Sequence, residues 1–238
     1  MAFPRAPKIR RRFVWILALV AIGGSCAALL GFCLWSGHIQ FNHPSVSRFP
    51  RRGIDISHHQ GRIDWEQLSQ ARLDFVIAKA TEGIDHKDTR FAEYSQAALA
   101  TGHRLGAYHF YRMCREGTAQ ARHFLRTIDG IPLDMGTALD LEYGGNCQAS
   151  GSREETIRQI HAFLDTVEQA TGKPVMIYAT AEFYEDWLQG DFAANPIWIR
   201  GIFREPSLSD GRGWTLWQYS ARGRLDGIEG FVDLNAMR

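Results

Sequence analysis

An alternation of short apolar segments with helical segments, beginning at residue 53, constrains the fold of this chain more than any other feature of its sequence. The apolar segments have the length and residue types of buried strands, and the segments between them place apolar residues three or four positions apart. The longest of these, residues 152–171, carries on one stripe Ile157, Ile160, Phe163, Leu164 and Val167. The sequence therefore predicts strands, each followed by a helical stretch, at residues 53–57, 74–80, 104–111, 137–143 and 173–179.

The alternation weakens after residue 188. Residues 196–200, 214–220 and 231–235 look like strands, but no proper helix separates them. Five strand–helix units followed by three bare strands predict a TIM-like α/β barrel, written (β/α)5(β)3. The 186 residues from 53 to 238 are few for a complete TIM barrel, which agrees with the loss of helices. A doubly wound open sheet is the alternative, but no Gly-x-Gly-x-x-Gly or Walker-type loop follows any predicted strand.

The N-terminal part of the chain has a different character. Residues 1–12 contain five Lys and Arg, and the 23 residues from 13 to 35 contain no charge. A helix of that length spans a bilayer core of ~30 Å, and the basic cluster before it favours the cytoplasmic side. We therefore expect a basic cytoplasmic tail (1–12), a single transmembrane anchor (13–35) in the cytoplasmic (inner) membrane, a linker of moderate stiffness (36–52) and a folded domain (53–238) on the periplasmic, extracytoplasmic side.

A cleaved signal peptide is the alternative to an anchor. The apolar run is long for a signal peptide, and no clear Ala-x-Ala cleavage site follows it. A lipoprotein attached through Cys26 fits less well, because the three residues before this cysteine lack the expected aliphatic side chain.

The distribution of charge excludes one class of partner. Residues 1–52 hold eight Lys and Arg and no acid, whereas residues 53–238 hold 19 Lys and Arg against 26 Asp and Glu, a net of −7. Since nucleic-acid affinity depends on a basic surface, an acidic domain argues against nucleic acid as a partner.

Asp140 and Glu142 are the first candidates for chemistry. They lie two residues apart on a predicted strand, so their side chains share one face, ~6.5 Å apart at the backbone. Mutual repulsion and desolvation are expected to raise the pKa of one, leaving one acid protonated and one ionised near neutrality. Glycosidic bond hydrolysis needs such a pair. The alternative is a structural pair of acids that is solvated or capped by a neighbouring helix.

Other polar residues also fall where predicted strands end, which is the functional face of a barrel. Aromatic side chains occur among them, and aromatic faces beside carboxylates commonly hold sugar rings. Taken singly, His109 suits a hydrogen-bonded core histidine and Trp198 suits packing. The further candidates at strand ends are Asp55, Lys79, Glu82, His109, Tyr178, Trp198, Gln218 and Asp233.

Metal, cofactor and nucleophile motifs are not found in the sequence. His58, His59 and His109 lack His-x-Glu or His-x-His spacing, so we expect neither a metal nor another cofactor. No Gly-x-Ser-x-Gly elbow is present. Cys114 and Cys147 each follow a strand on the same rim, where a disulfide and two free buried thiols both remain open.

Six short motifs, in this order, resemble glycoside hydrolase family 25, the lysozymes that cut the β-1,4 bond from N-acetylmuramic acid to N-acetylglucosamine in peptidoglycan. The similarity covers residues 53–238, and the family fold is a barrel with five helices and three bare strands. The motifs are Gly53-Ile-Asp-Ile-Ser57, Ala78-Lys-Ala-Thr-Glu-Gly83, Ala107-Tyr-His-Phe110, Leu139-Asp-Leu-Glu142, Leu216-Trp-Gln-Tyr-Ser220 and Val232-Asp-Leu-Asn235.

The resemblance implies roles for individual residues. Glu142 would be the general acid, and Asp140 would orient the substrate's acetamido group, which attacks the anomeric carbon in a substrate-assisted route. Asp55 and Asp233 would complete an acidic quartet. Peptidoglycan glycan strands would be bound by Lys79, Glu82, Tyr108, Tyr178, Trp198 and Gln218.

Three alternatives stay open beside this reading. A water-inverting route would use the same acids with a different spacing of carboxyls. A catalytically inert protein could keep the groove for binding peptidoglycan alone. A chitinase typically needs a longer Asp-x-x-Asp-x-Asp-x-Glu series, of which only Asp140-x-Glu142 is found. The family is usually secreted, so the predicted anchor is a departure from it.

Overall fold

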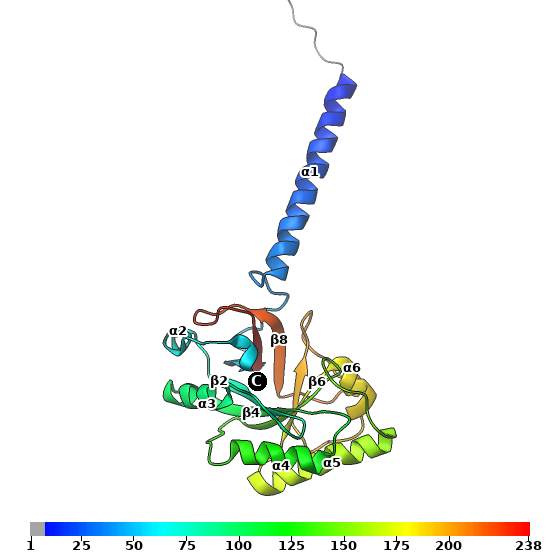
Figure 1. Cartoon of the computed structure of the whole chain (residues 1–238). Helices are drawn as coiled ribbons and strands as arrows, with labels where there is room; N and C mark the ends of the chain where they lie inside the picture. The colour runs from blue at the N-terminus through cyan, green and yellow to red at the C-terminus, as the bar shows by residue number, and fades with distance from the viewer. Residues whose placement is uncertain (1–7) are drawn as a thin grey trace, which may run out of the picture. The chain divides into compact units, whose positions relative to one another are not determined.

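The computed structural model describes residues 8–238, with side chains placed from residue 13 onward (Figure 1). The chain forms two compact units, one ending at Gln40 and one running from Phe41 to Arg238. The predicted basic tail, residues 1–12, lies partly outside the described residues. Its placement on the cytoplasmic side stays a prediction.

The N-terminal unit is dominated by a single helix, α1 (Lys8–Trp35). Its stretch Phe13–Trp35 has a mean hydropathy of 2.4 and buries none of its surface inside the protein. A helix that is apolar on all sides needs an apolar environment, and 23 residues are enough to cross a bilayer. The helix therefore fits membrane anchoring or a secretion signal.

The C-terminal unit is a closed barrel of eight strands, in the order β1-β9-β8-β7-β6-β5-β4-β2, with β1 pairing with β2 to close it. A two-residue strand, β3 (His86–Lys87), extends β2. The barrel strands are β1 (Arg51–Ile56), β2 (Phe75–Glu82), β4 (Arg104–Phe110), β5 (Gly136–Leu141), β6 (Met176–Thr180), β7 (Ile197–Arg200), β8 (Leu216–Gly223) and β9 (Val232–Met237).

Helices follow the first five barrel strands, which confirms the predicted (β/α)5(β)3 architecture. Within the described chain no helix follows β7 or β8. One difference is that β9 runs antiparallel to both of its neighbours, β1 and β8. The helical elements are η1 (His58–Gln60), α2 (Trp65–Gln70), α3 (Phe91–Ala100), α4 (Gly117–Ile128), α5 (Arg153–Thr171), α6 (Ala181–Phe183) and the π-helical turn η2 (Tyr184–Leu188).

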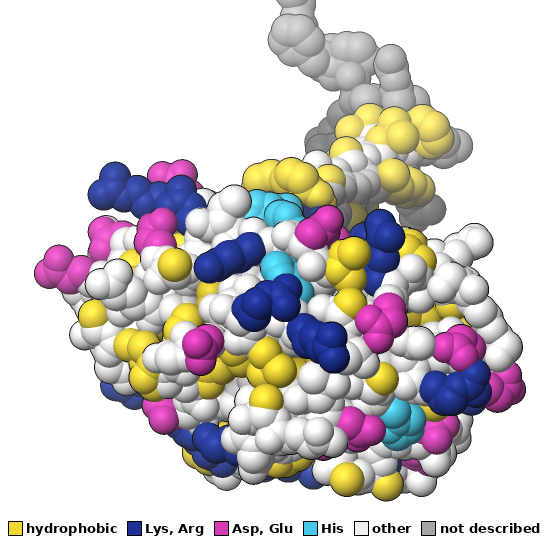
Figure 2. Space-filling model, turned by 60° about the horizontal axis from the view of Figure 1, so that its bottom comes forward, with side chains coloured by type: hydrophobic (Ala, Val, Ile, Leu, Met, Phe, Trp, Pro, Cys, Tyr) yellow, Lys and Arg dark blue, Asp and Glu magenta, His cyan; other side chains and the backbone are white. Residues whose placement is uncertain are grey.

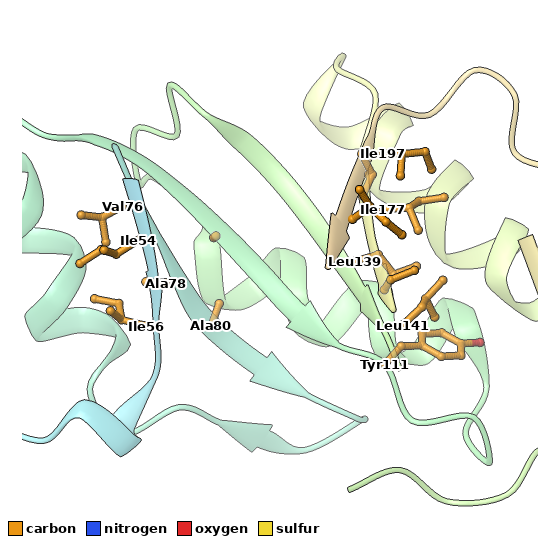
Figure 3. Close-up of a cluster of buried hydrophobic side chains, with 14 of the residues drawn as sticks. Ile54, Ile56, Val76, Ala78, Ala80, Tyr111, Leu139, Leu141, Ile177 and Ile197 are labelled. Carbon is orange, nitrogen blue, oxygen red and sulfur yellow. The ribbon is translucent and has the colours of Figure 1, made fainter. Parts of the chain in front are cut away.

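The core has two layers, because side chains along each strand alternate between the outside and the lumen of the barrel. The outer layer packs against the helices, as Figure 3 shows for Ile54, Val76, Leu139 and Ile177. The lumen is plugged by a second buried cluster, which consists of Phe75, Ile77, Ala138, Met176, Tyr178, Trp198, Leu216 and Met237. The barrel is therefore solid below its mouth, and only the carboxyl ends of the strands are left for a site.

Two glycines show how tightly the elements approach one another. A Cβ on Gly53 would lie 2.2 Å from the ring of Phe75 in the lumen. A Cβ on Gly117 would lie 1.9 Å from the carbonyl oxygen of Gln159, where α4 meets α5. Only glycine permits both contacts. The start of α2 is capped in the ordinary way, because the Asp64 carboxylate accepts from the Gln67 backbone N–H at 3.1 Å.

The segment 41–50, which the sequence predicts as linker, packs onto the barrel. Asn42 is buried and donates to the carbonyl oxygens of Gly201 and Tyr219 at 3.2 and 3.4 Å. Phe49 stacks on Trp214, with ring centroids 5.8 Å apart. The first strand also begins at Arg51, two residues before its predicted start, because it pairs with Met237 of β9.

Candidate active site

Four carboxyl groups gather at the mouth of the barrel. Asp55 lies on β1, Asp140 on β5 and Asp233 on β9, while Glu142 directly follows β5. All four line both of two adjoining cavities, of about 340 and 200 Å³. The structure thus brings together the acidic quartet that the family resemblance implied.

Asp55 and Asp233 form a coupled pair. They face each other directly in the antiparallel pairing of β1 with β9. Burial, the charge of Asp55 and a hydrogen bond to Asp55 raise the pKa of Asp233 to about 9. Burial also raises the pKa of Asp55, but hydrogen bonds from Asn235, Gln218 and Asp233 oppose this shift. Asp233 is therefore the protonated partner, and it donates to the Asp55 carboxylate.

Two side-chain amides support Asp55 as an anion. Asn235 donates from Nδ2 at 2.7 Å, and Gln218 donates from Nε2 at 3.1 and 3.3 Å to the two carboxyl oxygens. Each amide is itself oriented from the other side. Trp198 Nε1 donates to Asn235 Oδ1 at 2.8 Å, and the Tyr178 hydroxyl donates to Gln218 Oε1 at 3.0 Å.

This network includes three residues that the sequence predicts to bind sugar. Tyr178, Trp198 and Gln218 line the smaller cavity, but each is buried, and Trp198 is only 2% exposed. Their polar atoms are engaged with one another and with the Asp55 support. Their observed contacts orient the acids, and direct contact with a sugar stays a prediction.

Asp140 and Glu142 are both biased toward the protonated state. Burial, followed by the charges of Glu142 and Asp55, raises the pKa of Asp140 well above its ordinary value. Burial also raises the pKa of Glu142, opposed by the positive charge of Arg200. The sequence led us to expect one ionised acid within this pair, whereas Asp55 is the carboxyl with the strongest hydrogen-bonded support for its anion. Asp140 Oδ1 is buried and has no hydrogen-bond partner among the described residues.

A cationic group borders the larger cavity. Lys79 Nζ lies 2.8 Å from Glu82 Oε2 and 4.8 Å from the centre of the Phe110 ring. A β-bulge between Lys79 and Thr81 shifts the alternation of β2, so that Lys79 and Glu82 share one face. Arg112 completes the group, donating to Glu82 at 3.2 Å and to the Gly145 carbonyl at 2.6 Å. Burial alone would raise the pKa of Glu82. The hydrogen bond and charge of Lys79 and the charge of Arg112 outweigh burial and lower the pKa below its ordinary value.

His109 does not belong to the site. It is fully buried on the helix side of β4, between Thr81 at 2.7 Å and Gln120 at 3.2 Å. Burial lowers the pKa of His109 to about 3, so the ring is neutral. It is a hydrogen-bonded core histidine. Among the described residues, no group of three or more His, Cys, Asp or Glu is arranged to hold a metal ion.

The loops after β4 and β5 are joined next to Glu142. Cys114 and Cys147 form a disulfide with their Cα atoms 5.8 Å apart. Asn146, the residue before Cys147, donates from Nδ2 to the carbonyl oxygens of Tyr111 at 2.8 Å and Glu142 at 2.9 Å. The general-acid candidate is therefore held by a covalent and a hydrogen-bonded brace.

Several residues that line the cavities were not among the site residues predicted from the sequence, and Phe110 and Arg200 are the largest of them. Arg200 could have been found. Strand alternation places it on the same face as Trp198, and Trp198 points into the lumen.

Comparison with known proteins agrees with this geometry. The chain is 37% identical over 188 residues to "Uncharacterized protein YegX" of Escherichia coli (strain K12), which covers 77% of this chain and 68% of that protein. It is 36% identical over 197 residues to "Lysozyme M1" of Streptomyces globisporus, covering 77% of this chain and 66% of that protein. The structure of a family 25 glycosyl hydrolase from Bacillus anthracis aligns with a TM-score of 0.76 at 33% identity, covering 85% of this chain and 94% of that one.

The profile of "Glycosyl hydrolases family 25" matches residues 54–228. This range contains Asp55, Asp140 and Glu142, and the fourth acid, Asp233, follows a few residues later. With most of the barrel matched in sequence and in fold, the chain belongs to glycoside hydrolase family 25, a family of muramidases.

Proposed function

We propose that this chain is a peptidoglycan hydrolase, an N-acetylmuramidase (lysozyme) that cuts the β-1,4 bond between N-acetylmuramic acid and N-acetylglucosamine. The gathering of four unequally protonated carboxyls in one cleft, of which Asp55 and Asp140 are buried, carries the proposal. Relatives of the family bind peptidoglycan. The net charge of −7 for residues 53–238 gives no support to a nucleic-acid substrate.

Glu142 is the proton donor in this proposal. Its raised pKa keeps the carboxyl protonated near neutrality, so it can protonate the glycosidic oxygen as the bond breaks. The resulting Glu142 carboxylate then takes a proton from the water that completes hydrolysis. General acid catalysis of this kind contributes about 10²–10⁴ to the rate.

Asp140 assists the acetamido group of the substrate. The acetamido oxygen attacks the anomeric carbon as the leaving oxygen departs, and positive charge develops on the acetamido group. Asp140 Oδ1 has no partner in the described structure, which leaves this oxygen available to accept from the acetamido N–H. Asp55, whose anion is held by two amides, adds negative charge close enough to act on Asp140.

The test is hydrolysis of purified cell walls, followed by turbidity and by mass spectrometry of the fragments. We expect wild-type protein to release fragments with muramic acid at the reducing end. Glu142→Gln and Asp140→Asn should each lose about 10²-fold or more of the activity while staying folded. Glu154→Gln, an exposed acid in the first turn of α5, is the matched control and should keep the wild-type rate.

The alternatives give different results in the same assay. Binding of cell walls without cleavage by any of the proteins would favour an inert peptidoglycan-binding protein. Reducing ends at N-acetylglucosamine would contradict a muramidase. An unchanged rate for Glu142→Gln would remove it as the general acid.

We also propose that α1 is an uncleaved single-pass anchor, with the N-terminus in the cytoplasm and the catalytic domain on the extracytoplasmic side. Two observations support this: the charge-free stretch Phe13–Trp35 is long enough to span a bilayer, and the residues before it are basic.

A further inference from the structure

Arg200 stands at the mouth of the barrel and has no role in the mechanism above. It is the last residue of β7, paired in register with Thr180 of β6 and Gln218 of β8. Trp198, two residues earlier, points into the lumen, so Arg200 faces the same way one layer higher. Its side chain lines the smaller cavity together with Glu142 and Asp233.

The guanidinium group of Arg200 is not committed to other protein groups. It is half-buried, and among the described residues it makes no side-chain hydrogen bond or ion pair. Other arginines of the barrel are engaged: Arg112 binds Glu82 and the Gly145 carbonyl, and Arg212 donates to the Phe192 carbonyl at 2.7 Å. A half-buried guanidinium carries five N–H donors that need partners.

The charge around Arg200 makes it the available cation of the cleft. Lys79, the other cationic side chain that lines the cavities, is paired with Glu82 at 2.8 Å. The rest of the cleft is acidic, so an anionic substrate group would be repelled unless it met Arg200. A guanidinium matches a carboxylate through two parallel hydrogen bonds.

The proposed substrate carries such a group. Muramic acid differs from glucosamine by a lactyl ether, which ends in a carboxylate when no peptide is attached and in a neutral amide when a stem peptide is attached. We propose that Arg200 binds this lactyl carboxylate in the smaller cavity and thereby makes the enzyme prefer peptide-free strands. This inference rests on the proposed function and names the form of the substrate.

The preference gives the enzyme a place in a sequence of reactions. An amidase that hydrolyses the bond between the lactyl group and the stem peptide produces the free carboxylate. The preferred substrate is then the product of such an amidase. Strands that still carry stem peptides are cut more slowly.

The experiment compares two glycan substrates that differ only at this carboxyl. One is peptide-free muramyl glycan, and the other is the same glycan with its lactyl carboxyls converted to methylamides. For the wild-type chain in detergent, we expect kcat/KM to be about 10-fold or more higher on the carboxylate form, the range of one charge-assisted contact. Arg200→Ala should bring this ratio close to one, mainly through KM on the carboxylate form.

Two further variants separate recognition from general effects. Arg200→Lys keeps the positive charge but not the planar pair of donors, and it should give a ratio between those of wild type and Arg200→Ala. Arg204→Ala, an exposed arginine of the loop after β7, should keep the wild-type ratio. Arg200 also lowers the pKa of Glu142. Loss of that effect would change kcat/KM on both glycans equally and leave the ratio between them unchanged.

Failure of this inference can be told from failure of the proposed function. If the wild type cuts both glycans equally, or if both Arg200 variants keep the wild-type ratio, Arg200 does not bind the lactyl carboxylate. The protein would still be a muramidase in either case. If the wild type cuts neither glycan nor intact peptidoglycan, the proposed function itself is wrong.

Discussion

At the scale of single residues, the four acids of the mouth differ in what surrounds each carboxyl. Asp55 receives hydrogen bonds from two oriented amides, whereas Asp140 keeps one buried oxygen without a partner among the described residues. Asp233 holds a proton against Asp55. Chemistry therefore depends less on the number of acids than on the groups of β8 and β9 that favour one of them as an anion.

Asp233 gives a prediction for stability as a function of pH. Its pKa rises from the ordinary value of 3.8 to about 9 in the folded protein. The folded state therefore binds this proton more tightly than the unfolded state, and the stability it contributes is complete below about pH 4 and is lost as pH rises toward 9. The Asp233→Asn variant keeps an N–H donor for Asp55, and this amide proton does not dissociate as the pH rises.

We expect the Tm difference between Asp233→Asn and wild type to grow in favour of the variant from pH 5 to pH 9. A change of roughly 2–4 °C corresponds to about 1 kcal/mol in a domain of this size. Thermal unfolding at several pH values measures it. A Tm difference that stays constant across this range would show that Asp233 is not the proton carrier.

Part of the site could be predicted from single residues and part could not. Asp140 and Glu142 are visible as a pair because strand alternation is local. Asn235 belongs to the last of the six family motifs. Its role in orienting Asp55, however, depends on β9 closing the barrel beside β1, which no local pattern encodes. The salt bridge between Lys79 and Glu82 could not be predicted either. Residues three apart on a regular strand point to opposite faces, and these two side chains share a face only because of the β-bulge.

At the scale of elements, the loops after β4 and β5 act as one brace beside Glu142. The disulfide between Cys114 and Cys147 joins them across a sequence separation of 33 residues. Asn146 binds both loops at the same place. Loss of the disulfide or of the Asn146 hydrogen bonds is expected to make the segment that carries Glu142 more mobile.

Breaking the disulfide should destabilise the barrel. Closing a loop of this length stabilises a protein by roughly 3–4 kcal/mol in the chain-entropy account. Cys114→Ser with Cys147→Ser should lower the free energy of unfolding by about that amount and should reduce hydrolysis of cell walls. Denaturant unfolding with and without reductant measures the first effect.

The free cysteines of α1 provide the control. A Cys26→Ser, Cys33→Ser variant should respond to reductant as the wild type does. Unfolding of the wild type that is insensitive to reductant would contradict the proposed brace.

Sequence periodicity predicted the elements better than their directions or limits. All eight predicted strands are found, and the helices lie between the first six of them. The periodicity of residues 231–235 is the same for either strand direction, so the antiparallel course of β9 could not be foreseen. The start of β1 at Arg51 is likewise set by its partner Met237 and not by its own residues.

At the scale of the whole molecule, the basic N-terminal part and the acidic domain differ in the chemistry of their surfaces. On the face shown in Figure 2, acidic and basic side chains of the domain are mixed. The strongly apolar surface belongs to α1, whose stretch Phe13–Trp35 has no charge. These properties suit a domain in water that is carried by a helix in lipid.

The proposed anchor can be tested on the mature protein. We expect its N-terminus to be intact, and the protein to leave the membrane fraction only with detergent. Protease added outside intact spheroplasts should digest residues 41–238, with lysed spheroplasts as the control for protease activity. A mature N-terminus beyond residue 25 would indicate a cleaved signal sequence.

The pairing of the first barrel strand with the last has a consequence for biosynthesis. A ribosome completes β1 early, but the edge of β1 that pairs with β9 stays open until β9, which ends at Met237, has been made. The same final strand delivers Asp233 and Asn235. An unfinished chain therefore lacks both the closed fold and a complete set of acids, so the proposed hydrolase would be inactive until its last strand is in place.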